Sequence, residues 1–463
     1  MKRTYTLLAI GCGLLFAAST CFAQMYTVTD LGTLGGTSGE AFDINNSGQV
    51  VGYAFTSGNA ESHAFRTAAN KPINPETDDL GTIGTPSLAY SINDSGQVAG
   101  YFFITPGETH AFRTAPNRPI DPATDDLGTL GGTSSIGRDI NNHGQVVGFS
   151  YPPESKGWRG FRTASNRAIN SATDDLGSFV GFFTIAEGVN DAGQAVGYSW
   201  TWDNGGTVHA FRAAPNRPIN PRTDDLGTLG GDSSAAYAIN SFGQVVGSSD
   251  LVGNISTHAF RAAPHRRINP ATDDLGTLGG SRSSANGINS FGQVVGNSDL
   301  AGYLVHAFLY SGGRMRDLNE LIPSDSGCEV FQASAINEAG QIAGNGVCSG
   351  ENHPVVLNPI YQGLVRPPIN ADGSSVFSAK RESVSIAFLL NKYGTRTCTL
   401  PAATIAIVRV TDGRLTTARN AKLSITGCRY AYDLKANRLG VGEYRADISI
   451  DGIMVGHAVF ALQ

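Results

Sequence analysis

The stretch that decides the fold is a three-part sequence repeat, which is clearest near residue 290. It consists of Asp274-Leu275-Gly276-Thr277-Leu278-Gly279-Gly280, then Ile288-Asn289-Ser290-Phe291-Gly292-Gln293-Val294-Val295-Gly296, then His306-Ala307-Phe308. Its middle part occurs seven times, with successive asparagines 48 to 50 residues apart. These asparagines are Asn45, Asn93, Asn141, Asn190, Asn240, Asn289 and Asn337. A fixed period of this length indicates repeated supersecondary units.

Each repeat predicts four short strands. The first is the Asp-Leu-Gly-Thr-Leu stretch, closed by a Gly-Gly turn, and the second is the apolar approach to Ile-Asn. A turn with Gly in its last position, such as Asn240-Ser241-Phe242-Gly243, leads into the third strand, Gln-Val-Val-Gly. The fourth strand is His-Ala-Phe-Arg. The 3.6-residue apolar period of helical repeats is absent.

The repeats therefore predict an all-β fold. Seven small sheets that cannot bury their own faces favour a seven-bladed β-propeller, with an open β array as the alternative. There are also seven Asp-Leu strands, from Asp30 to Asp317. The first of them is in a position to close the ring against the last blade.

The three repeated phrases resemble those of the bacterial extracellular repeat proteins called the HAF family. The resemblance covers about residues 26 to 358. It implies an exported repeat protein, and it brings no agreed activity and no catalytic residues.

The two ends of the chain predict export and a second domain. Met1-Lys2-Arg3, the apolar run from Leu7 to Ala18 and Cys21-Phe22-Ala23 are typical of a signal peptide over residues 1–23. A lipid anchor at Cys21 is the alternative. We expect the propeller over 24–360, a linker over 361–375 and a small β-sandwich over 376–463. The expected location is secreted, periplasmic or cell-surface, with no membrane span.

The predicted sandwich has strands at 384–389, 404–410 and 443–450, with a hairpin at Asp451-Gly452. About 90 residues of strands held by one disulfide indicate an immunoglobulin-like arrangement. This tail is similar to the PxKF-type modules at the ends of exported bacterial proteins, although Ser385 and Ala387 stand where that family has Pro and Lys. In strand 443–450 we expect Arg445, Asp447 and Ser449 to point outward.

Four cysteines follow the predicted signal peptide, an even number that favours disulfides in an exported chain. Pairing between sequence neighbours joins Cys328 to Cys348 and Cys398 to Cys428. Metal ligation is the alternative, but the spacings are too wide for a zinc pattern. The formal net charge of −6, without a basic cluster, argues against nucleic acid and anionic membranes as partners.

Two sets of polar residues recur with the repeat. Six histidines share one position, and we expect each to stabilise its own blade by hydrogen bonds; metal binding is the alternative. They are His63, His110, His209, His258, His306 and His353. Paired aspartates such as Asp273-Asp274 are expected to cap turns, with Ca²⁺ binding as the alternative. We therefore predict no metal and no cofactor.

The three tryptophans break the symmetry of the repeat. Trp158, Trp200 and Trp202 lie between the predicted third and fourth strands of units three and four, with Tyr151 nearby. Exposed on one face, they would stack on sugars or anchor a protein partner; packed between blades, they would be structural.

The sequence contains no catalytic motif such as Gly-x-Ser-x-Gly or His-Glu-x-x-His. We therefore expect a monomeric, non-catalytic protein that binds an extracellular ligand, either a glycan or a protein. The alternative is a secreted hydrolase or lyase acting on polysaccharide, for which Glu154, Glu187 and Asp203 break the repeat.

Overall fold

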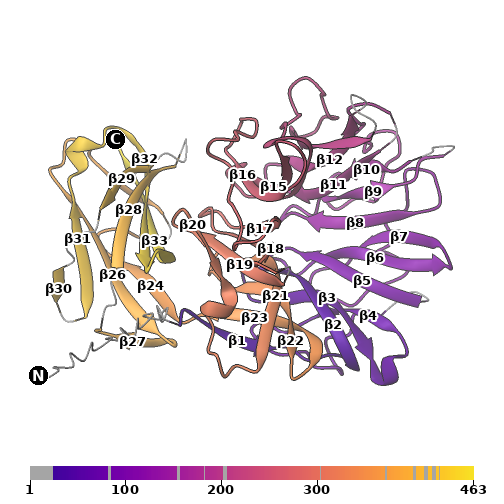
Figure 1. Cartoon of the computed structure of the whole chain (residues 1–463), viewed down its shortest axis with the longest axis horizontal. Coiled ribbons are helices and arrows are strands. Elements are labelled where there is room, and N and C mark those ends of the chain that lie inside the picture. The colour runs from indigo at the N-terminus through magenta and orange to yellow at the C-terminus, as the bar shows by residue number, and fades with distance from the viewer. Residues whose placement is uncertain are drawn as a thin grey trace, which may run out of the picture.

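The fold is all-β in the computed structural model of the chain (Figure 1). The structure describes residues 24–81, 85–153, 157–181, 183–201, 206–302, 304–370, 373–399, 403–410, 415–419, 424–426 and 428–463. The expected signal peptide, residues 1–23, lies outside them. The helical elements of the described residues are the single 3-10 turns η1 (Ser57–Asn59), η3 (Leu318–Glu320) and η4 (Ala436–Arg438). No helix among these residues is long and apolar enough to cross a membrane.

Residues 26–359 form seven small antiparallel sheets, one for each sequence repeat. Five have three strands: β2 (Gly35–Ile44), β3 (Val50–Thr56) and β4 (Ser62–Arg66); β5 (Thr85–Ile92), β6 (Val98–Thr105) and β7 (Glu108–Arg113); β8 (Ser135–Ile140), β9 (Val146–Ser150) and β10 (Arg159–Arg162); β11 (Thr184–Val189), β12 (Ala195–Thr201) and β13 (Thr207–Ala213); β14 (Gly230–Ile239), β15 (Val245–Leu251) and β16 (Thr257–Ala262). Two have four strands: β17 (Ser283–Ile288), β18 (Val294–Asp299), β19 (Val305–Ser311) and β20 (Arg314–Asp317); β1 (Tyr26–Asp30), β23 (Glu351–Pro359), β22 (Ile342–Cys348) and β21 (Cys328–Ile336).

The turn between the first two strands of each sheet follows from the Ile-Asn-x-x-Gly-Gln phrase. In unit one the Asn45 side chain accepts hydrogen bonds from the backbone N–H groups of Ser47 and Gln49. Gly48 adopts a φ of 81°, a conformation that glycine reaches without steric cost. The glycine of the following strand is required for another reason: a Cβ at Gly52 would overlap the carbonyl oxygen of Glu40 on the neighbouring strand.

The seven sheets close into a ring. The strands β2, β5, β8, β11, β14, β17 and β21 each contact the next, and β21 contacts β2. The repeat asparagines connect the same units, since each side chain donates to the backbone carbonyl of the next asparagine, from Asn45 to Asn93 and onward until Asn337 donates to Asn45. β1 pairs with β23, so the N-terminal strand completes the sheet of the seventh unit.

The first predicted strand of each repeat differs from expectation. The Asp-Leu stretch does not join the sheet of its own unit. It makes an isolated bridge to the His-Ala-Phe strand of the preceding unit, as Asp79 does with Phe65 of β4. The Asp79 carboxylate accepts from the Gly81 N–H, which turns the chain directly after this bridge. Only Asp30 and Asp317 lie at the ends of full strands, β1 and β20.

The C-terminal residues form two five-stranded sheets, yellow in Figure 1. One contains β24 (Tyr361–Arg366), β26 (Val384–Lys392), β27 (Thr395–Thr397), β30 (Ser424–Thr426) and β31 (Arg429–Leu434). The other contains β25 (Ser375–Phe377), β28 (Ala403–Arg409), β29 (Leu415–Arg419), β32 (Gly442–Ile450) and β33 (Ile453–Leu462). Their shared core includes Phe388, Tyr430, Tyr444 and Phe460, all fully buried.

Two expectations for this part of the chain were wrong in detail. The expected linker 361–375 contains β24, which pairs with β26 because the chain runs from β23 directly into the new sheet. Arg445 and Asp447 of β32 point away from their own core as predicted, but Arg445 is only 9% exposed. It is covered because its guanidinium donates to the backbone carbonyls of Ser290 and Phe291 in the ring.

Disulfides join Cys328 to Cys348 and Cys398 to Cys428, the two pairs that sequence proximity favours. The first connects the paired strands β21 and β22 within the seventh unit. Such bonds persist in oxidising compartments, so they are consistent with an exported protein.

Candidate functional site

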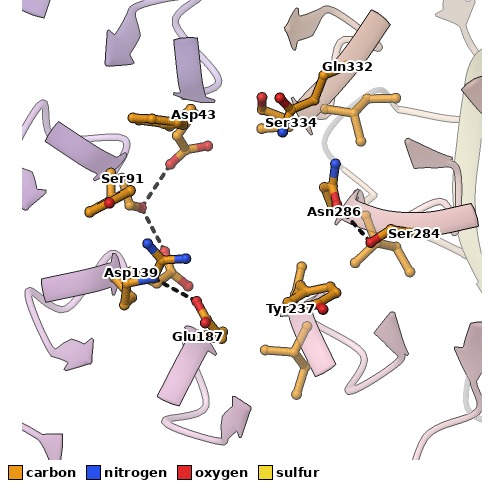
Figure 2. A pocket seen from close by; sticks show the side chains of 18 residues that line it. Asp43, Ser91, Asp139, Glu187, Tyr237, Ser284, Asn286, Gln332 and Ser334 are labelled. Atoms are coloured by element: carbon orange, nitrogen blue, oxygen red, sulfur yellow. Dashed lines mark hydrogen bonds and ion pairs between the residues drawn. The ribbon is translucent and has the colours of Figure 1, made fainter. Parts of the chain in front are cut away.

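A central cavity of about 680 Å³ lies between the inner strands of all seven units (Figure 2). One position of the repeat, three residues before the asparagine, contributes a lining side chain from every unit. These residues are Phe42, Tyr90, Arg138, Glu187, Tyr237, Asn286 and Ser334. At this position the side chain differs between most units, although the asparagine three residues later is constant.

A β-bulge explains why this position faces the cavity. In all seven units the pairing register between the first two strands shifts at this residue, as at Phe42 between Ala41 and Asp43. A bulge leaves one residue unpaired and redirects its side chain, and bulges are common beside functional sites. The preceding residue is always small and buried, as with Ala41 and Ala236.

An ion pair occupies one side of the cavity. Arg138 Nε donates to Glu187 Oε2 at 2.7 Å, and the guanidinium carbon lies 4.2 Å from the ring centroid of Tyr90. Burial alone would lower the pKa of Arg138, but Glu187 and Tyr90 shift that pKa upward, so the side chain stays charged. The Glu187 side chain is 10% exposed and that of Arg138 is 28% exposed, so Arg138 is the more accessible member of the pair.

Two aspartates share one serine beside this ion pair. The Ser91 hydroxyl lies 2.8 Å from Asp43 Oδ2 and 2.7 Å from Asp139 Oδ1. A hydroxyl has one proton to donate, so both contacts are hydrogen bonds only when one carboxyl is protonated. Burial, with the charge of Asp139, raises the pKa of Asp43 to about 6, and burial also raises the pKa of Asp139.

Both aspartates also connect neighbouring units. Asp43 accepts from the backbone N–H groups of Ile44 and Ile92. Asp139 accepts from those of Ile140 and Val189. All four carboxylate oxygens therefore accept backbone hydrogen bonds, which assigns this pair a structural role in four consecutive units.

The opposite side of the cavity is uncharged. Figure 2 shows, across the cavity from Asp43, Asp139 and Glu187, the side chains of Tyr237, Ser284, Asn286, Gln332 and Ser334. The Tyr237 hydroxyl lies 3.3 Å from Ser248 Oγ.

Phe42 and Tyr90 form an aromatic pair in the cavity lining, with ring centroids 5.0 Å apart. The cavity thus combines aromatic faces, amides and hydroxyls with a single ion pair.

The recurring histidines pair with the recurring aspartates. The Nδ1 atom of each histidine lies 2.6 to 3.2 Å from the carboxylate of an Asp-Leu stretch: His63 with Asp79, His110 with Asp126, His209 with Asp225, His258 with Asp274, His306 with Asp317 and His353 with Asp30. Arg159 takes the place of histidine in unit three and pairs with Asp175. The first aspartate of each pair caps a turn, as Asp273 does for the Asn269 N–H.

Each of the six histidines is therefore hydrogen-bonded within the ring, as expected, although the sequence did not predict aspartate as the partner. Among the described residues, no three His, Cys, Asp or Glu side chains form a group that could hold a metal ion.

Of the aromatic residues predicted to bind a ligand, Tyr151, Trp158 and Trp200 do not line the central cavity. Trp158 packs against Tyr151, with ring centroids 3.7 Å apart, and against Phe149 at 4.6 Å. Trp200 lies in strand β12, not in a loop; it is 46% exposed and stacks on Phe183. Trp202 lies outside the described residues. The aromatic binding surface stays a prediction, with Trp200 its most accessible member.

Of the three acids that break the repeat, Glu187 lines the cavity, and Glu154 and Asp203 lie outside the described residues. Four features of the cavity were not predicted from the sequence: Arg138, Tyr90, Tyr237 and the Asp43–Ser91–Asp139 group. A signal for them was present: the two positions before Ile-Asn differ from unit to unit, although the residues that follow are repeated.

No family model matches this chain, and no curated protein matches it. Among solved structures, it is similar to a protein from B. thetaiotaomicron described as the extracellular domain of a one component system, with 11% sequence identity and a TM-score of 0.34. That comparison covers 95% of this chain and 59% of the other.

Proposed function

We propose that this chain is an exported, non-catalytic binding protein of the HAF type. In this proposal the ring is a seven-bladed β-propeller and the C-terminal sheets form an immunoglobulin-like sandwich. Seven sheets with a closed circle of asparagine hydrogen bonds support the propeller, and the two disulfides support export. The signal peptide over residues 1–23 belongs to the same proposal.

The central cavity is the proposed ligand site. The observation that carries this proposal is that one bulged position per unit faces the cavity and differs in every unit except for a repeated tyrosine. Structural positions of the repeat, such as the asparagines, stay constant. Variation at positions that line a concave space, beside constant structural positions, is what a specific ligand requires.

The cavity lining favours a polyhydroxylated ligand such as a sugar unit. Tyr90, Phe42 and Tyr237 offer aromatic surfaces for the apolar faces of a sugar ring. Arg138, Asn286 and Gln332 supply hydrogen-bonding groups for hydroxyls, and charge-assisted bonds are the stronger ones.

A polysaccharide hydrolase is the second candidate, because Asp43 and Asp139 both lie within hydrogen-bonding distance of Ser91. Two carboxyl groups at short separation are what a retaining glycosidase uses. Binding is favoured over hydrolysis because the oxygens of both carboxylates are already engaged by backbone N–H groups.

A glycan array tests the proposal. The mature chain is compared with a double variant, Arg138→Met with Glu187→Gln, which removes both charges together and leaves neither unpaired. The matched control is Arg159→Met with Asp175→Asn, an ion pair of the same ring that does not line the cavity.

We expect binding that the cavity variant loses and the control keeps, with no release of reducing ends. Released product would favour the hydrolase. Equal binding by both variants would exclude the central cavity as the ligand site.

A further inference from the structure

A second cavity lies between the ring and the C-terminal sheets. This interdomain groove has a volume of about 500 Å³ and is lined by residues of the fifth and sixth units and of β28, β32 and β33. Its walls are joined at two points: Arg445 donates to the Ser290 carbonyl at 2.9 Å, and Arg316 donates to the Asp451 carbonyl at 2.8 Å. These contacts connect the ring directly to the C-terminal sheets beside the groove.

Two buried donors in this groove lack a hydrogen-bond partner. Gln293 is 3% exposed, yet its Nε2 atom donates to none of the described residues, and the same holds for the buried Nε atom of Arg409. Both residues line the groove. A buried donor without a partner costs about 1–3 kcal/mol, so such groups usually have a partner in the functional state.

The repeat explains why Gln293 lacks its partner. In units one, two and seven the equivalent glutamine donates to an asparagine in the connector that follows the next unit around the ring: Gln49 to Asn117, Gln97 to Asn166 and Gln341 to Asn70. After the seventh unit the chain runs from β23 directly into β24 and has no such connector. The change of fold at this point leaves Gln293 Nε2 without that partner, while Gln293 Oε1 still accepts from Asn289 Nδ2.

The groove is positively charged within an acidic protein. Arg261, Arg409 and Arg445 line it, and Asp447 is the one acidic residue among the lining residues that the structure describes. Asp447 is neutralised by two hydrogen bonds from Arg445, at 2.6 and 3.0 Å. Burial, together with the charge of Arg445, also lowers the pKa of neighbouring His457 to about 4.

We propose that the interdomain groove binds a small organic carboxylate. The carboxylate only accepts hydrogen bonds, so its oxygens match the free Gln293 Nε2 and Arg409 Nε donors, and its charge matches the excess of arginine. Phe291 and Met454 supply apolar surface for the rest of the molecule. This site is separate from the central cavity and does not depend on the function proposed for that cavity.

Titration calorimetry on the full mature chain tests the inference with acetate, benzoate, glutarate and galacturonate, each beside its neutral amide or alcohol. The first variant is Gln293→Glu, which keeps the acceptor for Asn289 Nδ2 and replaces the free donor with an acid. The second is Arg409→Met, at a half-buried position. The control is Gln97→Glu, the same substitution at the equivalent position far from the groove.

We expect saturable binding of at least one carboxylate, at least tenfold weaker binding of its neutral analogue, and a tenfold or greater loss in each groove variant at pH 8. The control should bind as the unmodified chain does. The proposal is overturned if none of the four carboxylates binds, or if affinity survives in Arg409→Met and in Gln293→Glu. Should Gln293→Glu not fold, the Arg409→Met result decides alone.

Discussion

The circle of asparagine hydrogen bonds should be a principal source of ring stability, and Asn240→Ala tests this. The Asn240 side chain is 4% exposed. Its Oδ1 accepts from the N–H groups of Phe242 and Gln244, at 3.1 and 3.0 Å. Its Nδ2 donates to the Gln244 side chain at 2.8 Å and to the Asn289 carbonyl of the next unit at 3.0 Å.

The loss expected from Asn240→Ala follows from these four partners. Each is left without its hydrogen bond, which costs about 1–3 kcal/mol where water cannot replace it. Three of the four contacts are only part-buried, so about 1 kcal/mol for each partner is appropriate. We therefore expect the unfolding free energy to fall by about 4 kcal/mol, a large share of the roughly 5–15 kcal/mol of a typical domain.

Equilibrium urea unfolding followed by tryptophan fluorescence is the assay, since Trp158, Trp200 and Trp202 all belong to the ring sequence. The control is Ser241→Ala, an exposed position in the same turn that should change stability by less than about 0.5 kcal/mol. Asn240→Asp keeps the side-chain oxygen that accepts hydrogen bonds within the turn, but it removes the N–H group that donates to the carbonyl of the next unit. If Asn240→Ala lowers the unfolding free energy no more than the control does, or if Asn240→Asp does not lower it, the asparagine circle is not a principal source of ring stability.

Two further predictions concern pH and the aromatic surface. The folded-state pKa of Asp43, about 6, lies above the ordinary value of about 3.9 in an unfolded chain. Its contribution to stability is therefore complete below about pH 4 and is lost as pH rises through 6, by about 3 kcal/mol for a shift of about two units. We expect Asp43→Asn to flatten the pH dependence of unfolding between pH 4 and 7; an unchanged slope would contradict the shared proton. We also expect Trp200→Ala to weaken binding of an extended glycan about fivefold, because stacking on an exposed ring contributes about 1 kcal/mol. Trp158→Ala should instead destabilise the ring, and unchanged glycan affinity in Trp200→Ala would remove that surface from the binding model.

Much of the fold could be predicted from the sequence, because its units are encoded locally. The Asn-x-x-Gly-Gln phrase specifies a turn through contacts within five residues, as Asn45 makes with Ser47 and Gln49. Repetition then fixes the number of sheets. The disulfide pairs followed from proximity along the chain, and the hydrogen bonding of the histidines from a residue type recurring at one position, although their aspartate partners were not predicted. Pairing of the Asp-Leu strand was missed because its partner lies in the preceding unit.

The candidate sites depended on tertiary structure. The cavity residues occupy bulged positions such as Arg138, and a bulge interrupts the two-residue alternation from which sequence reasoning assigns inside and outside. Asp43, Ser91 and Asp139 belong to three different units and meet only because the ring closes.

The interdomain groove depends on contacts between residues that are even farther apart along the chain. Gln293 occupies an ordinary repeat position, and Arg445 has the alternation of an outward-facing residue. Only the packing of the C-terminal sheets against the sixth unit buries Arg445, and only the missing connector after β23 frees the Gln293 amide. The sequence by itself determined the repeating unit, because its contacts are local. The tertiary structure decided which side chains face a common space, because those contacts join units that are far apart along the chain.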